Sequence, residues 1–166
     1  MNRTVLAAQA ATVTLFFILA TALRPAFAAG AVEMQVEHIL TQAIDEYNQS
    51  MESGDSSAWV KYFTDNVQRR SPANEQTGKK EVGEYFAWEF KHFQAKMIAK
   101  KILVSGRSAA VVFVWDAVHK PSNSSVKLEM VGIFEMASSG RFDSVTYYYD
   151  TAKAGKFSAE TTASVK

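Results

Sequence analysis

Two polar side chains, Tyr47 and Arg69, lie in patterns of otherwise apolar residues and could bind or act on a small molecule. Tyr47 continues a helical spacing of apolar residues that begins at Val36. Arg69 alternates with Val67 and Ser71, so a regular strand would place all three on one face. A tyrosine hydroxyl can donate a hydrogen bond to a carbonyl or enolate oxygen, and an arginine can hold a carboxylate with two N–H groups. Together they predict a site for a compound with a carbonyl or acidic head.

Both residues also have a structural interpretation that the sequence leaves open. Tyr47 could pack in the core with its hydroxyl bonded to a backbone carbonyl, because a buried tyrosine needs a hydrogen-bond partner. A bulge could turn Arg69 to solvent beside Arg70, because an arginine that is buried without a partner is very costly.

The apolar body of such a ligand would need an apolar surface to bind, and the second half of the chain contains the residues for one. After Phe93 the apolar spacing changes from helical to alternating, which predicts strands at 96–105, 108–120, 125–136 and 141–150. Alternation gives each strand one apolar face, and Gly132 lies on such a face. We expect the large side chains on these faces to bind the ligand: Trp115, Met130, Phe134, Tyr147 and Tyr149.

Three helical stretches precede this sheet. The apolar spacing predicts a helix at 32–51, a short helix after Gly54 that carries Trp59, Tyr62 and Phe63, and a third helix at 79–93. A short strand at 67–71 and a turn at Pro72 separate the last two helices. Helices followed by an antiparallel meander indicate an α+β fold.

Residues 1–28 have the pattern of a secretory signal peptide. Arg3 precedes an apolar run at 5–23, Pro25 breaks the helix, and Ala26-Phe27-Ala28 supplies the small residues of a cleavage site. We therefore expect the mature chain to start at Ala29, to be secreted or periplasmic, and not to insert stably in a membrane. The alternative is an uncleaved anchor, since the run is nearly long enough to span a bilayer; N-terminal sequencing of the exported protein distinguishes the two.

Composition limits the remaining possibilities. The chain has 166 residues, a net charge of +1 and no cysteine. This balance gives no sign of a nucleic-acid surface, which needs clustered lysine and arginine, and the lack of thiols excludes a cysteine nucleophile. We find no metal-ligand spacing and expect no cofactor. We expect one domain at 29–151, followed by a disordered tail at 152–166 that is rich in alanine, lysine, threonine and serine.

The stretch from Tyr47 to Pro72, which includes Gly54-Asp55, resembles the ketosteroid isomerases without a gap. The last strand, from Gly140-Arg141-Phe142 to Tyr148-Tyr149-Asp150, is similar to the closing strand of SnoaL-like polyketide cyclases. Both groups belong to the nuclear-transport-factor-2-like superfamily. The resemblance covers about 36–151 and implies a cone in which a curved antiparallel sheet packs on three helices around an apolar pocket.

The resemblance also implies site residues. Tyr47 falls on the isomerases' oxyanion-binding tyrosine, which makes it our candidate catalytic residue. Ser71 falls on the position of their base, and Gly132 on that of their second acid. Two of the three groups are therefore missing, which argues against strict ketosteroid isomerase chemistry, since proton transfer needs a carboxylate or equivalent within reach. Ser71 remains a candidate for substrate binding, with Arg69.

These observations predict an exported domain that binds, or isomerises or cyclises, a small hydrophobic carbonyl or carboxylate compound. If it is an enzyme, its activity would be of the isomerase, cyclase or lyase type and would use no metal. The alternative is a non-catalytic ligand-binding or homodimeric interaction module. A homodimer is expected because the outer sheet face places apolar residues between charged ones: Asp116, Lys127, Glu129, Val131, Ile133 and Glu135.

Overall fold

A computed structural model describes residues 30–155 of the chain. The predicted signal peptide and residues 156–166 of the predicted tail lie outside the described residues. None of the described helices is long and apolar enough to cross a membrane.

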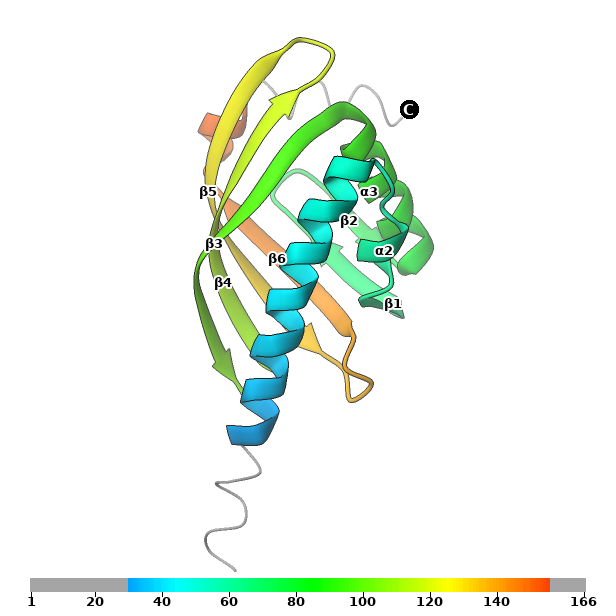
Figure 1. The fold of residues 1–166 in the computed structure, drawn as a ribbon, viewed down its shortest axis with the longest axis vertical. Helices are drawn as coiled ribbons and strands as arrows, with labels where there is room; N and C mark the ends of the chain where they lie inside the picture. Colours follow the sequence, from blue (N-terminus) through cyan, green and yellow to red (C-terminus); the bar gives the residue numbers. More distant parts are fainter. Residues whose placement is uncertain (1–29, 156–166) are drawn as a thin grey trace, which may run out of the picture.

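The described residues form two layers, with the helices on one side of a curved sheet (Figure 1). The helical layer consists of a long N-terminal helix at residues 30–53, α2 at Ser57–Val60 and α3 at Lys79–His92. The sheet comprises β1 (Phe63–Arg70), β2 (Glu75–Thr77), β3 (Phe93–Ser105), β4 (Ser108–His119), β5 (Ser124–Met136) and β6 (Phe142–Tyr149). The α+β class predicted from the sequence is therefore confirmed.

The sheet is mixed, not wholly antiparallel as the resemblance implied. Its six strands lie in the order β2-β1-β6-β5-β4-β3, and β1 runs parallel to β6 while all other neighbours are antiparallel. The reason is the route of the chain: α3 carries it from β2 to the far edge of the sheet, and the meander then returns to lie beside β1. A parallel pair needs such a long connection.

Local boundaries differ from the predicted ones around the second helix. α2 is a single turn with Ser56 at its N-cap, and Oδ1 of Asp55, one residue earlier, accepts a hydrogen bond from the backbone N–H of Ser57 (2.9 Å). Phe63 therefore begins β1 instead of ending the helix. β1 is longer than predicted, and a short strand that was not predicted, β2, follows the turn at Pro72 and pairs with β1 in an antiparallel hairpin.

The predicted faces of the strands are confirmed by burial. In β5 the residues on the even-numbered positions from Leu128 to Met136 point inward, while Lys127, Glu129 and Glu135 are exposed. Gly132 lies opposite Val111 on one side and Tyr147 on the other, and both of these side chains are buried. Gly132 therefore faces the interior.

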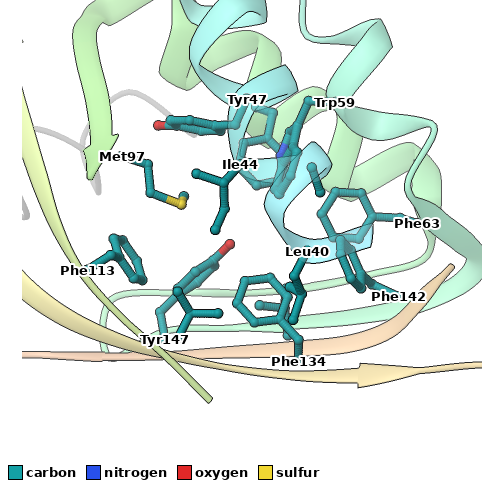
Figure 2. Close-up of a cluster of buried hydrophobic side chains, with 14 of the residues drawn as sticks. Leu40, Ile44, Tyr47, Trp59, Phe63, Met97, Phe113, Phe134, Phe142 and Tyr147 are labelled. Carbon is teal, nitrogen blue, oxygen red and sulfur yellow. The ribbon is translucent and has the colours of Figure 1, made fainter. Parts of the chain in front are cut away.

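An aromatic cluster joins the two layers. Trp59 is fully buried and makes edge-to-face contacts with Tyr47, Phe63 and Phe86, at ring-centroid distances of 5.5, 5.1 and 5.6 Å. Figure 2 shows Tyr47 entering the cluster from the helical layer and Tyr147 entering it from the sheet. Large rings from both layers thus fill one end of the cone, and such contacts add to the free energy of burial.

The N-terminal helix is also fixed to the edge of the sheet. The side-chain amide of Asn48 donates to the carbonyl oxygen of Met97 (3.0 Å) and accepts from its N–H (2.8 Å), as a neighbouring strand would. A groove of about 260 Å³ lies beside this contact, between the helix and β3. The two charged residues that line it, Asp45 and Lys96, are both exposed.

The predicted start of a disordered tail at residue 152 is wrong for its first residues. Residues 151–155 form a helical turn. Asp150 starts this turn by accepting hydrogen bonds from the N–H groups of Ala152 and Lys153 (2.9 and 3.4 Å), and Ala154 is buried. The burial of Ala154 against the domain stabilises a segment whose composition alone suggested no structure.

Gly132→Ala should destabilise the domain by about 1–3 kcal/mol, the usual cost of overpacking a core. A Cβ at this position would lie 2.7 Å from Cε2 of Phe134 and 3.4 Å from Cε1 of Phe113. Urea unfolding measures the effect. Gly83→Ala in α3 is the matched control, because its Cβ meets nothing closer than 3.7 Å and alanine favours a helix by about 0.5–1 kcal/mol. Equal effects of the two substitutions would contradict the packing described for Gly132.

Candidate functional site

A cavity of about 100 Å³ lies between the helical layer and the sheet. This is several times the smallest space that holds one water molecule. Every element except β2 and α2 contributes to its lining, which brings together seven of the predicted site residues: Tyr47, Arg69, Ser71, Trp115, Met130, Tyr147 and Tyr149. The lining also contains residues that were not among the predicted site residues, including Asn74, Tyr85, Trp88, Glu89 and Ala154.

Phe134 is the one predicted residue that does not line the cavity. It faces inward as predicted but lies in the aromatic core, where its ring is 5.2 Å from that of Phe142 and 6.1 Å from that of Tyr147. Alternation identified its face correctly. It could not show that the helices fill the cone at this depth and leave space only nearer to Met130.

Tyr47 is held by two side chains from different elements. Its hydroxyl donates a hydrogen bond to Oε1 of Glu89 in α3 (2.6 Å) and accepts one from Nε1 of Trp115 in β4 (2.9 Å). Burial, followed by the nearby charge of Glu89, raises the pKa of Tyr47 well above its ordinary value, so the hydroxyl keeps its proton. The partner is a carboxyl group, not the backbone carbonyl considered above.

Glu89 is the functional residue that sequence reasoning missed. It is 7% exposed, and burial raises the pKa of its carboxyl; the hydrogen bond from Tyr47, the charge of Arg69 and hydrogen bonding from Tyr85 oppose part of that effect. One signal could have found it. Glu89 follows Phe86 by three residues and precedes Phe90 by one, so it lies on the same buried face of α3.

Arg69 points into the domain, so the interpretation in which a bulge turns it to solvent is wrong. The irregularity between β1 and β6 lies between Phe63 and Gln68, and Arg69 pairs regularly with Val145. Its Nη1 donates to Oδ1 of Asn74 and Oε1 of Gln76, both at 2.7 Å. Its guanidinium carbon lies 3.6 Å from the centre of the Tyr85 ring, a close cation–π contact.

Ser71 helps to place Asn74 at the cavity. The backbone N–H of Ser71 donates to the carbonyl oxygen of Asn74 (2.9 Å), which closes the turn through Pro72. The Ser71 hydroxyl lies 3.0 Å from Oδ1 of Asn74, the atom that also accepts from Arg69. Ser71 is therefore part of the polar network that holds the arginine.

The arrangement places a basic and an acidic side chain in one cavity without joining them. Arg69 is 4% exposed and Glu89 is 7% exposed. The ion pairs found among residues 30–155 do not include one between them, although the charge of Arg69 opposes part of the rise in the pKa of Glu89 that burial causes. A ligand in the cavity would meet both a hydrogen-bond donor with positive charge and a carboxyl group with a raised pKa. Within the same residues, no three histidine or acidic side chains are grouped as metal ligands.

Solved structures share this fold. The epoxide hydrolase/cyclase-like enzyme SalBIII, which has a role in pyran ring formation in the polyether salinomycin, superposes with a TM-score of 0.61 at 22% identity, over 72% of this chain and 96% of its own. A proposed SnoaL-like polyketide cyclase from Jannaschia sp. CCS1 gives a TM-score of 0.62 at 16% identity, over 73% and 89%. A proposed isomerase from Bacillus subtilis superposes with a TM-score of 0.64 at 13% identity, over 73% of this chain and 93% of its own.

No protein of curated function matches the chain. The family model for the SnoaL-like domain matches residues 44–145. That stretch begins in the N-terminal helix just before Tyr47 and ends in β6, so it contains α2, α3 and most of the sheet. With the fold shared by the solved structures, this match shows that the chain belongs to the SnoaL-like family of the nuclear-transport-factor-2-like superfamily.

Proposed function

We propose that the domain binds a small hydrophobic carbonyl compound in its cavity and catalyses proton transfer at the carbon next to the carbonyl group. The observation that carries this proposal is the buried Glu89, which shares the cavity with the positive charge of Arg69 without pairing to it. Carbon acids of this kind need a base close to the C–H bond and a positive group close to the oxygen that becomes negative.

Glu89 acts as the base in its ionised form. It takes the proton, the electron pair of the C–H bond forms the enolate, and the negative charge develops on the carbonyl oxygen. Arg69, which lines the same cavity, stabilises that charge. In a substrate with a conjugated double bond, the proton then returns from Glu89 to the far carbon of that system, which is an isomerisation. Alternatively, the enolate carbon attacks a second carbonyl carbon of the same molecule, whose C=O π bond breaks and whose oxygen takes the proton from Glu89, which closes a ring.

Burial suits Glu89 to this role. A carboxylate whose pKa is raised accepts a proton more readily than an exposed one, and burial raises the pKa of Glu89. Tyr47 and Trp115 form a chain of hydrogen bonds that fixes the orientation of the carboxyl group. The acid comes from α3, whereas the positions of the isomerases' acids hold Ser71 and Gly132, so strict ketosteroid isomerase chemistry is not proposed.

The rest of the lining suits a small apolar body. Leu128, Met130, Trp115 and Tyr149 line the sheet side of the cavity. The similar structures support chemistry of this general kind, since one takes part in ring formation and another is a proposed isomerase.

A second candidate is binding without catalysis. It is favoured by one observation: the Tyr47 hydroxyl already donates to Glu89, so it is not available to a ligand oxygen as in the isomerases. Exchange of carbon-bound protons separates the two candidates.

Wild-type protein should speed the exchange of the α-protons of small apolar ketones in deuterated water, as followed by proton NMR. Glu89→Gln should lower this rate by about 10²–10⁴-fold, the usual contribution of a general base, because the amide cannot take the proton. Glu84→Gln is the control, since Glu84 lies on the same helix with its side chain 66% exposed, and it should leave the rate unchanged. If the wild type binds ketones but exchange stays at the buffer rate, the domain is a binding module.

Glu89 should also make stability depend on pH. Its pKa in the folded protein is raised, so the folded state favours the protonated carboxyl group. The contribution of Glu89 to the free energy of unfolding is therefore fully present below its pKa in the unfolded chain, about 4.3, and is lost as pH rises through its pKa in the folded protein. Glu89→Gln and the wild type should differ least near pH 4, and the variant should gain relative stability at higher pH. The gain should be about 1.4 kcal/mol for each unit of the shift. Urea unfolding across this range measures it, with Glu84→Gln as the control; a difference that does not vary with pH would contradict a raised pKa.

We also propose that the domain is a homodimer that associates through the outer face of the sheet. Across the strands, Val112 lies beside Val131, which lies beside Tyr148. Val112 is 36% exposed, Tyr148 is 58% exposed, and the nearby Leu103 is 51% exposed. Charged residues border this apolar area, for example the ion pair between Lys127 and Asp116 (2.8 Å). Apolar side chains with a polar rim are typical of an interface.

Light scattering should therefore give the mass of a dimer at about 50 µM, a rough concentration for an interface of this class. A lysine at position 112 or 148, as in Val112→Lys and Tyr148→Lys, should shift the protein to monomer because it places a charge in the apolar area. Lys80→Ala is the control, since that side chain is 90% exposed on α3. A monomeric wild type would remove the proposal.

A further inference from the structure

Two consecutive arginines of β1 have opposite kinds of partner. Arg70 faces outward, and its Nε donates to Oε1 of Glu75 (2.8 Å), an ion pair. Arg69 faces inward, and the residue opposite it on β2 is Gln76, whose Oε1 accepts from Nη1 (2.7 Å). The exposed arginine thus pairs with a glutamate, and the buried arginine meets the neutral amide of nearly the same shape.

This is the reverse of what stability alone would favour. A surface ion pair contributes little to stability, whereas a buried charge needs compensation. The second acceptor of Arg69, Oδ1 of Asn74, is also a neutral amide. The Tyr85 ring covers one face of the guanidinium group at 3.6 Å and gives partial compensation through a cation–π contact. The positive charge of Arg69 is held in place and forms no ion pair among residues 30–155.

Donors of the guanidinium group also remain. Both hydrogen bonds found for this side chain leave from Nη1, and Nε is buried without a partner. Nη2 makes no hydrogen bond to the described residues. Since Arg69 lines the cavity, a ligand there can accept a charge-assisted hydrogen bond from it.

We propose that Arg69, with Asn74, Gln76 and Tyr85, is an anion subsite of the cavity, and that the small hydrophobic ligand carries a carboxylate that binds there. This inference rests on the proposed function only in requiring that the cavity takes a ligand. A single planar carboxylate matches the edge of a guanidinium group whose face is covered. A phosphate would bring a second negative charge next to Glu89, which lines the same cavity. With Glu89 as the base, the substrate class becomes hydrophobic 2-oxo acids, in which the carboxylate and the adjacent carbonyl oxygen can both face Arg69.

Matched pairs of ligands test the subsite. Isothermal titration at about pH 7.5 compares cyclohexanecarboxylate with cyclohexanecarboxamide, phenylacetate with phenylacetamide, and hexanoate with hexanamide. Each acid has nearly the shape of its amide but carries the charge. At least one acid should bind the wild type about tenfold or more tightly than its amide, the effect of about one charge-assisted hydrogen bond.

Two isosteric substitutions on β2 provide the variant and its control. Gln76→Glu gives Arg69 an internal carboxylate. The affinity for the acid should therefore fall to about the affinity for the amide, and the affinity for the amide should stay unchanged. The same variant should unfold at an equal or higher temperature, because it neutralises a buried charge. Glu75→Gln removes the partner of Arg70 on the outer face and should leave the preference unchanged. Arg69→Met, which removes the charge with little loss of volume, should abolish the preference and serves if Gln76→Glu fails to fold.

The outcomes separate the subsite from the proposed function. If acids bind no better than their amides, if no acid binds, or if the preference survives both Gln76→Glu and Arg69→Met, the anion subsite is wrong. Exchange of ketone α-protons that depends on Glu89 can still be present in that case, and the proposed function then stands. If acids bind through Arg69 but no exchange occurs, the subsite holds and the domain binds acids without catalysis.

Discussion

One chain of hydrogen bonds connects three elements of this domain and fixes its only acidic group within the described cavity. Trp115 in β4 donates to Tyr47 in the N-terminal helix, and Tyr47 donates to Glu89 in α3. Each of these side chains has a polar group that would be costly to bury alone. Because each supplies the partner of the next, the sheet and two helices can meet around a polar centre. The cavity, the orientation of Glu89 and the packing of Trp59 against Tyr47 all depend on this contact.

The same centre explains why the cone is not filled. Glu89 and Arg69 are both buried, but they do not form an ion pair with each other. Apolar rings surround them, from Tyr85 on α3 to Tyr147 on β6. A direct ion pair between Glu89 and Arg69 would satisfy both charges in the ligand-free protein, so neither group would be free to bind a ligand. Separated charges in a site of low polarity cost stability and are typical of functional sites.

The sheet has two faces with different tasks. The inner face carries the aromatic core near Phe134 and Phe142 and the cavity near Met130 and Trp115. The outer face carries Val112, Val131 and Tyr148 side by side, which a partner subunit could cover. The two faces are coupled only through the strands, so a ligand in the cavity and a partner on the outer face need not compete.

The periodicity of apolar residues was enough to predict the α+β class, the main helices and the inward faces of β4, β5 and β6, because burial on one face imposes a period that a single sequence displays. It also placed Tyr47, Trp115 and Tyr149 on the faces that line the cavity.

Tertiary structure decided the rest. Glu89 sits on an amphipathic helix, where a lone acid is usually exposed. Its burial is tolerable because Tyr47 from a distant helix donates a hydrogen bond to it, and because the charge of Arg69 and hydrogen bonding from Tyr85 also favour the carboxylate. Arg69 turns inward because Gln76 and Asn74 accept its hydrogen bonds, and that pairing follows from a hairpin too short to predict. The parallel contact of β1 with β6 joins strands more than 70 residues apart, and whether an inward residue such as Phe134 lines the cavity or the core depends on how closely the helices approach it. Apart from the contacts of Arg69, which lie within one hairpin, these features arise from contacts between segments far apart in the chain, and such contacts leave no local pattern in the sequence.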